Sequence, residues 1–178
     1  MKLRIITGVI LALFMLGVLL FASEPFFTGL TAIIVILAAW EWSGLMRLPT
    51  LPQRLGYVAI VVLLLLLSNF VSPRGLMLGA SFGWIAALIL MLLYSYGRVF
   101  TAVYWVGFVG IFVLVPFWVG LNVLRTMQSG QYVVLFLVIL VAAIDTGGYF
   151  VGSFFGRTRI AEKLSPSKSF EGLLGGIV

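Results

Sequence analysis

The side chains able to do chemistry are few in this sequence. Its 178 residues include five Asp or Glu, eleven Lys or Arg, and neither histidine nor cysteine. Imidazole catalysis, His-ligated zinc or haem, disulfide bonds and thiolate nucleophiles are therefore excluded. What remains is the chemistry of carboxylates, cations and hydroxyls, and it is concentrated at Asp145 and in residues 157–172.

Asp145 lies late in an apolar run and is followed by Thr146, Gly147 and Gly148. A carboxylate at membrane depth is costly, so it normally faces a polar cavity or a partner. Because its neighbours are small, a ligand or another backbone can come close. We expect Asp145 to face a polar cavity open to the cytoplasm, where it would hold a metal ion or a polar substrate group. A structural ion pair with a basic residue is the alternative.

The polar stretch from Arg157 to Gly172 is rich in cations and hydroxyls. Ser165 and Pro166 are typical of an N-cap and a first helical position, so they predict a helix that begins there. The free N–H groups of that helix, together with Lys163 and Lys168, favour an anion. Three hydroxyls could donate to phosphate oxygens, those of Ser165, Ser167 and Ser169. The stretch suits a triphosphate, a lipid phosphate or both, and the alternative is a capped helix whose lysines reach lipid headgroups.

The composition indicates that membrane helices position these residues. Apolar residues make up 63% of the chain and charged residues 9%, against about 25% charged in soluble domains. A soluble globular domain and a disordered chain are both excluded. We predict an all-α, polytopic membrane bundle of about six transmembrane helices, with a seventh started at the C-terminus. The predicted spans are Ile5–Phe21, Phe26–Leu45, Leu55–Phe70, Gly75–Tyr94, Val99–Leu121 and Gln131–Phe150.

The distribution of Lys and Arg predicts the orientation of these spans. With the N-terminus in the cytoplasm, the inner side holds nine basic residues and the outer side holds two, Arg74 and Arg125. Positive charge normally gathers on the inner side, so the segment after the sixth span should face the cytoplasm of an inner membrane. The first apolar run is longer than the core of a signal peptide and is read as a retained span. Nothing in the charge pattern suggests a nucleic-acid partner.

Glycine spacing predicts close helix packing in two places. Each of two sets of glycines has members four residues apart, so each lines one helix face. The two sets are Gly75, Gly79 and Gly83, and Gly148, Gly152 and Gly156.

Elsewhere, Glu41 stands between Trp40 and Trp42 near the inner end of the second span, and we read it as an interfacial carboxylate that pairs with Arg47.

The C-terminal segments resemble one family closely. The matching residues run Asp145-Thr146-Gly147-Gly148-Tyr149-Phe150-Val151-Gly152, then Phe155-Gly156-Arg157, then Lys163-Leu164-Ser165-Pro166-Ser167-Lys168-Ser169-Phe170-Glu171-Gly172, and Gly175-Gly176. In order and spacing they are similar to the phosphatidate cytidylyltransferases, the CDP-diacylglycerol synthases. Those enzymes carry D-[ST]-x-A-Y-x-x-G, F-G-[KR], S-P-x-K-[ST]-x-E-G and a G-G pair. The preceding five spans agree with the family only in hydropathy.

The resemblance implies an enzyme of phospholipid biosynthesis that converts CTP and phosphatidic acid into CDP-diacylglycerol and pyrophosphate with Mg²⁺. It implies Asp145, Lys168 and Glu171 as catalytic residues, Asp145 also as a metal ligand, and Glu171 as the group that orients the loop or a metal-bound water. The implied substrate-binding residues are Lys163, Ser165, Ser167, Ser169 and Arg157. Membrane lipids are the surrounding partners, and a homodimer is left open. Residues 1–121 would form the N-terminal bundle and residues 122–178 the start of the catalytic region.

The chain departs from the family in two respects. Gly148 stands where the family often has alanine, which is a mild change. The family's later K-D pair and H-G-G-x-x-D-R-x-D signature has no counterpart here, so we expect the main metal-binding acids beyond Val178 and expect this segment to be incomplete for catalysis. Two alternatives stay open. One is another CTP-dependent lipid-phosphate enzyme, a CDP-archaeol synthase or polyprenol kinase relative, and the other is a non-catalytic transporter or scaffold.

Overall fold

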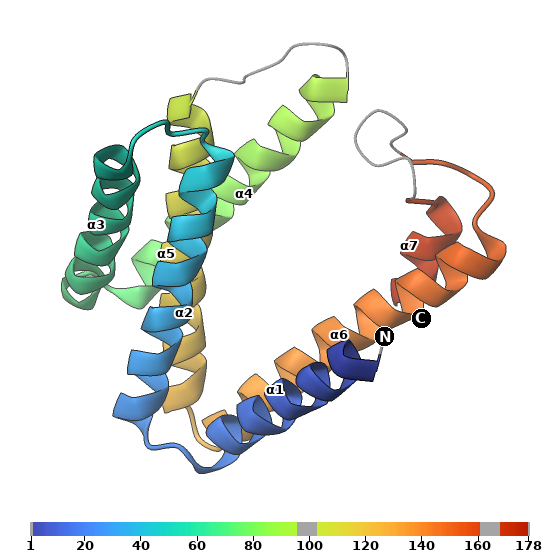
Figure 1. Ribbon diagram of the computed structural model, residues 1–178, viewed down its shortest axis with the longest axis horizontal. Coiled ribbons are helices and arrows are strands. Elements are labelled where there is room, and N and C mark those ends of the chain that lie inside the picture. The colour runs from blue at the N-terminus through green and yellow to red at the C-terminus, as the bar shows by residue number, and fades with distance from the viewer. Residues whose placement is uncertain (1, 96–102, 161–167, 178) are drawn as a thin grey trace.

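The regular elements of the protein are helices throughout the part of the chain that the structure describes. The computed structural model describes residues 2–95, 103–160 and 168–177 (Figure 1). This confirms the predicted all-α membrane bundle. The helices are α1 (Lys2–Phe21), α2 (Glu24–Leu45), α3 (Leu51–Leu67), the short 3₁₀ helix η1 (Ser68–Phe70), α4 (Pro73–Ser95), α5 (Val103–Thr126), α6 (Gly130–Phe155) and α7 (Phe170–Ile177).

Proline fixes where several of these helices begin. Pro25 and Pro52 stand in the first turns of α2 and α3, and Pro73 is the first residue of α4. Proline suits a first turn because its missing N–H would have had no partner in the helix. The residues before α2 and α3, Ser23 and Thr50, are extended and so end the preceding connection.

A helix stands at each of the six positions where a span was predicted. Four described segments are long and apolar enough to cross a membrane by length and composition: Glu24–Leu45, Leu51–Phe70, Trp105–Thr126 and Gly130–Phe155. The apolar part of α1, Ile6–Phe21, is shorter. The helices are therefore confirmed, whereas membrane crossing by α1 and α4 stays a prediction.

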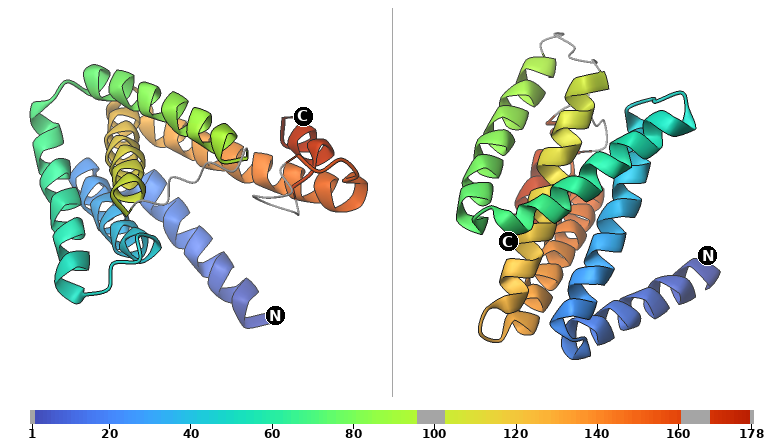
Figure 2. Two further views of the ribbon diagram at one scale, coloured as in Figure 1. Left: turned by 90° about the horizontal axis from the view of Figure 1, so that it is seen from above. Right: turned by 90° about the vertical axis from the view of Figure 1, so that its left-hand side faces the viewer.

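The main core lies between α2, α3 and α5. Its buried residues include Val35 and Ala39 of α2, Val61 of α3 and Trp118 of α5. A smaller cluster joins α1, α2 and α6 through Val18, Leu19, Phe27 and Val134. Figure 2 shows α1 extending away from the main bundle. This small cluster packs the C-terminal end of α1 against the other helices.

Buried Arg125 anchors the end of α1. Its Nη1 donates to the carbonyl of Leu19 at 2.7 Å and its Nη2 to the carbonyl of Ala22 at 2.6 Å. The guanidinium also stands 5.3 Å from the ring centre of Phe27. The last carbonyls of a helix lack intrahelical partners, so a cation there satisfies them and complements the helix dipole. The sequence placed Arg125 only on the outer side, whereas the structure makes it a buried clasp between α5 and α1.

The two glycine sets behave differently. Gly148, Gly152 and Gly156 all face α7 or the residue before it, which confirms the prediction of close packing there. The α4 set does not form one packing face. Gly83 lies against Phe112 of α5, but Gly79 has nothing within 4 Å of the place a side chain would occupy. The reason is geometric: Gly79 lies on an exposed side of α4, whereas α5 packs against the neighbouring Met77, whose Cε lies 3.7 Å from the place that a side chain on Gly120 would occupy.

Candidate functional site

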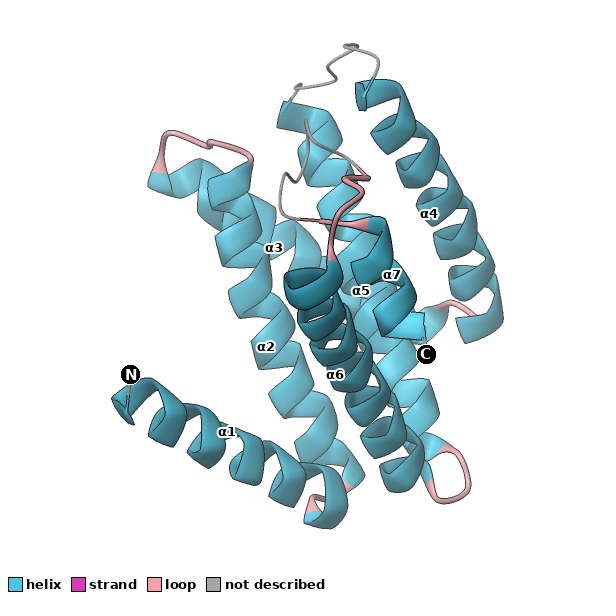
Figure 3. Ribbon diagram, turned by 90° about the vertical axis from the view of Figure 1, so that its right-hand side faces the viewer, coloured by secondary structure: helices cyan, strands magenta, loops and turns pink. Residues whose placement is uncertain are grey.

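Most of α6 projects from the bundle, and its C-terminal half meets α7. Only 6% of the most apolar stretch of α6 is buried inside the structure. Figure 3 shows α7 lying beside α6 and running back along it. A methyl group placed on Gly172 would stand 3.0 Å from both the carbonyl oxygen of Gly148 and the Cα of Gly152. One placed on Gly176 would stand 3.0 Å from the carbonyl oxygen of Ile144. Glycine is therefore needed for this backbone-to-backbone contact.

Helix α7 begins later than the sequence predicted. Its first residue is Phe170, and Lys168 and Ser169 precede it in non-helical backbone. A helix that starts at Ser165 or Pro166 and continues through Lys168 and Ser169 is therefore a wrong prediction. Ser165 and Pro166 themselves lie outside the described part of the chain. The true N-cap is Ser169, whose Oγ accepts from the backbone N–H of Gly172 at 3.1 Å. Ser169 is only 3% exposed because it is packed under the glycine face of α6.

Residues 158–160 and 168–170, within the polar stretch that follows α6, form a short antiparallel pairing. Phe170 N–H donates to the carbonyl of Thr158 at 2.8 Å, and Ile160 N–H donates to the carbonyl of Lys168 at 3.3 Å. Arg159 and Ser169 face each other between these two bonds. We call residues 157–160 and 168–171 the neck of the loop. Two segments that lie about ten residues apart in sequence are thereby held side by side.

The Glu171 carboxylate fastens the neck. Its Oε2 accepts from the backbone N–H of Arg157 at 3.0 Å and from that of Thr158 at 3.2 Å. Its Oε1 accepts from the same Thr158 N–H at 3.2 Å and from the Thr158 hydroxyl at 2.9 Å. The backbone N–H of Glu171 itself, followed by those of Arg157 and Thr158, lowers the pKa of this carboxyl from 4.5 to about 2.

The neck carries three exposed cations, Arg157, Arg159 and Lys168, against the single carboxylate of Glu171. Such an excess of positive charge favours an anionic ligand. Sequence reasoning identified Arg157 and Lys168 but missed Thr158 and Arg159 as parts of this arrangement. Nothing in the sequence singles these two out, because their importance comes from the pairing across the neck. Lys163, Ser165 and Ser167 lie outside the described residues, so their predicted roles stay predictions.

Asp145 is exposed on α6, at the far end of the α7 crossing from the neck. The neck follows Gly156 at the end of α6, and eleven residues of helix separate Asp145 from Gly156, about 16 Å along the axis. The structure thus places Asp145 on α6 near the C-terminal end of α7, whereas Lys168 lies just before the N-terminal end of α7. The polar cavity predicted to contain both stays a prediction.

The described acids do not make a metal site by themselves. No group of three or more Asp or Glu side chains able to hold a metal ion occurs in the described ranges. Both oxygens of Glu171 are engaged by the neck, so of the two acids predicted for the site Asp145 is the one left to contribute a ligand. Mg²⁺ prefers several oxygen ligands and retains waters, so one carboxylate does not complete a site.

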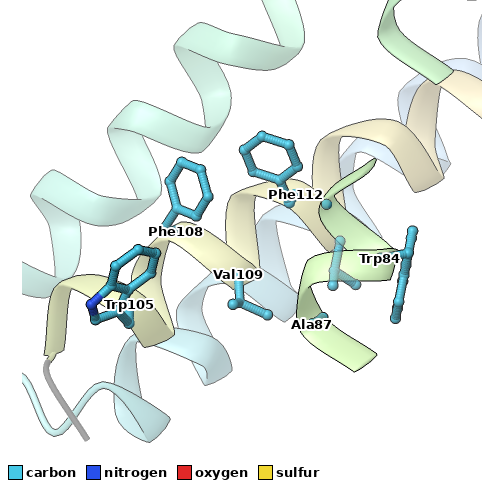
Figure 4. Close-up of a pocket in the computed structure, with 8 residues that line it drawn as sticks. Trp84, Ala87, Trp105, Phe108, Val109 and Phe112 are labelled. Carbon is cyan, nitrogen blue, oxygen red and sulfur yellow. The ribbon is translucent and has the colours of Figure 1, made fainter. Parts of the chain in front are cut away.

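A groove between α4 and α5 lies apart from these residues. Figure 4 shows Trp84 and Ala87 of α4 beside Trp105, Phe108 and Phe112 of α5. The side chains around it are apolar or aromatic, and none of the predicted site residues lines it. The groove therefore takes no part in the polar chemistry at the neck.

Comparison with known proteins finds relatives that match nearly the whole chain. The sequence matches the family described as the cytidylyltransferase family over residues 2–178. It is 33% identical over 189 residues to a phosphatidate cytidylyltransferase of Pseudomonas aeruginosa, covering 99% of this chain and 66% of that relative. It is also similar to phosphatidate cytidylyltransferases of Haemophilus influenzae, at 29% identity over 100% of this chain and 69% of the relative, and of Bacillus subtilis, at 28% over 100% and 68%. The chain thus spans about two thirds of the length of these curated relatives.

Proposed function

We propose a function from one premise: the chain belongs to the cytidylyltransferase family. The full-length protein would transfer a cytidylyl group from CTP to phosphatidic acid, giving CDP-diacylglycerol and pyrophosphate for phospholipid biosynthesis. The observation that carries this proposal is the match of the whole chain to relatives named phosphatidate cytidylyltransferase. The basic neck supports it, because both substrates are phosphates and need cations.

In the proposed reaction, an oxygen of the lipid phosphate attacks the α-phosphorus of CTP. A new P–O bond forms there as the bond to the β-phosphate breaks, and pyrophosphate leaves with the bonding electron pair. Such transfers depend on positioning and charge neutralisation more than on covalent catalysis. Arg157 and Lys168 would neutralise phosphate charge at the neck. The remaining proposed loop contacts are Lys163, Ser165 and Ser167. The predicted phosphate contact of Ser169 is not part of the proposal, because its side chain is buried and caps α7.

We propose Asp145 as a polar group of the same site and as one ligand of Mg²⁺. The physical motive is the cost of an unpartnered carboxylate at membrane depth. The described residues contain no group of three or more acids that could hold the ion by themselves. Asp145 and the neck lie about 16 Å apart along α6, so we propose that residues of the full-length protein outside the described ranges complete the site between them.

The protein is a multi-pass membrane protein, and its orientation is a proposal. With the N-terminus and the neck in the cytoplasm, the neck would face the compartment that contains CTP. The nine-to-two distribution of basic residues supports this orientation and an inner-membrane location. A homodimer is also a proposal, to be tested by light scattering of the detergent-solubilised protein.

The test follows the products of CTP in membranes that contain the full-length protein. With phosphatidic acid, pyrophosphate and CDP-diacylglycerol should appear in equal amounts. A CTP-dependent lipid kinase would instead release CDP and phosphorylate an unphosphorylated lipid such as diacylglycerol or polyprenol. A transporter or scaffold would show neither product and no thermal shift with CTP, and that result would overturn the proposed function.

A further inference from the structure

We infer that Glu171 is a positioning residue: it holds the neck closed so that Arg157, Arg159 and Lys168 present their charges together to a substrate phosphate. This inference rests on the proposed function and deepens it. It also assigns Glu171 a role that excludes direct metal binding or proton transfer in the closed neck.

Both carboxylate oxygens of Glu171 are used within the protein. Four donor contacts, between 2.9 and 3.2 Å, come from two backbone amides and one hydroxyl on the opposite side of the neck. A carboxylate that binds Mg²⁺ must offer an oxygen lone pair to the ion. Here each oxygen is already an acceptor within the protein, so the contacts that Glu171 makes are those of a clasp.

Few other hydrogen bonds between the described residues close the neck. Apart from Glu171, the pairing consists of two backbone hydrogen bonds, one of them at 3.3 Å. The Ser169 hydroxyl caps α7 and does not cross to residues 157–160. Among the described residues, the only side-chain hydrogen bonds between the two sides of the neck are therefore those that Glu171 accepts. Because α7 is packed on α6 through glycines, the clasp ties the loop to a fixed support.

The cations of the neck are not neutralised by the Glu171 carboxylate. The Glu171 carboxylate is turned toward backbone amides, and it forms no ion pair with Arg157, Arg159 or Lys168. The cations therefore keep their charge for a ligand, although an acid stands among them. A fixed group of cations neutralises a phosphate better than the same cations on an unrestrained chain, since ordering them costs conformational entropy.

The kinetic experiment compares single and double variants of the full-length protein in membranes. Glu171→Ala should raise the KM of CTP or phosphatidic acid about ten-fold with a smaller change in kcat, because charge-assisted hydrogen bonds are lost at the neck. In a Lys168→Ala background the same change should have a smaller effect, because Glu171 acts in part through Lys168, while Arg157 and Arg159 remain. Glu171→Gln keeps one carbonyl acceptor and should restore part of the loss. Glu41→Ala, on an exposed carboxylate of α2, is the matched control and should leave both constants unchanged.

A second readout does not depend on activity. The sequence has no cysteine, so spin labels can be attached at Arg159→Cys and Lys168→Cys alone. Glu171→Ala should broaden the distance distribution between them, and Glu41→Ala should not. A narrow distribution in the labelled protein that keeps Glu171, together with no transferase activity in the unlabelled wild type, would sink the proposed function and leave the clasp intact.

Three outcomes would overturn the inference itself. One is an unchanged spin-label distance in Glu171→Ala. Another is a large loss of kcat at constant KM, which a metal ligand or proton-transfer group would give. The third is full additivity of Glu171→Ala with Lys168→Ala.

Discussion

The contact between α6 and α7 gives the sharpest test of the structure, through the substitution Gly172→Ala. The new methyl group would lie 3.0 Å from the carbonyl oxygen of Gly148 and 3.0 Å from the Cα of Gly152. Both distances are shorter than ordinary van der Waals contacts, so α7 must move away from α6 by a few tenths of an ångström. Both obstacles are backbone atoms and cannot rotate aside.

The expected cost follows from that displacement. Overpacking of this kind typically costs about 1–3 kcal/mol, and alanine returns up to about 1 kcal/mol through its higher helix propensity. A net loss of about 1–2 kcal/mol corresponds to opening that is roughly 5- to 30-fold more frequent. Amide hydrogen exchange of the α7 peptide, measured by mass spectrometry in detergent, should accelerate by that factor.

Gly79→Ala is the matched control, because the same methyl group on α4 would meet nothing within 4 Å. It should leave exchange in α7 unaltered and should stabilise α4 slightly or not at all. Equal exchange of α7 in Gly172→Ala and the wild type would refute the reasoning. So would an equal acceleration in both variants, since the effect would then not come from the α6–α7 contact.

Four further outcomes are expected. Arg125→Ala should lower the free energy of unfolding of the solubilised protein by about 2–3 kcal/mol, because two carbonyls at the end of α1 lose a charged donor. The control Arg74→Ala, at an exposed position, should change the thermal midpoint little. Asp145→Asn should reduce turnover of the full-length protein about a hundred-fold or more with near-normal expression, and unchanged turnover would remove this residue from the site. A Ser167→Cys protein should react with impermeant thiol reagents from the cytoplasmic side, and labelling from the outer side only would contradict the proposed orientation. The pKa of Glu171 is lowered from 4.5 to about 2 in the folded protein, so the hydrogen bonds of its carboxylate should be fully present above pH 4.5 and be lost as pH falls toward 2. Spin-label mobility at the neck should therefore stay constant from pH 7 to 5 and rise only at lower pH.

The sequence alone determined where the helices lie, because apolar runs and their interruptions are local features of the chain. The six predicted spans coincide with α1 to α6 to within a few residues at most ends. The motifs around Asp145 and Ser165–Gly172 also indicated the family, which the match over residues 2–178 confirms. The packing of Gly148, Gly152 and Gly156 against another helix was predictable for the same reason, since spacing fixes which side chains share a helix face.

Only the tertiary structure decided which distant groups meet. Ser165-Pro166 carries the stronger local start signal, yet α7 begins at Phe170, where Ser169 caps it while packed under α6. The partners of Glu171 are thirteen and fourteen residues away, and Arg125 reaches carbonyls more than a hundred residues away. A polar side chain selects among many donors and acceptors once the helices have packed, and that choice depends on the positions of the helices rather than on residues nearby in the chain.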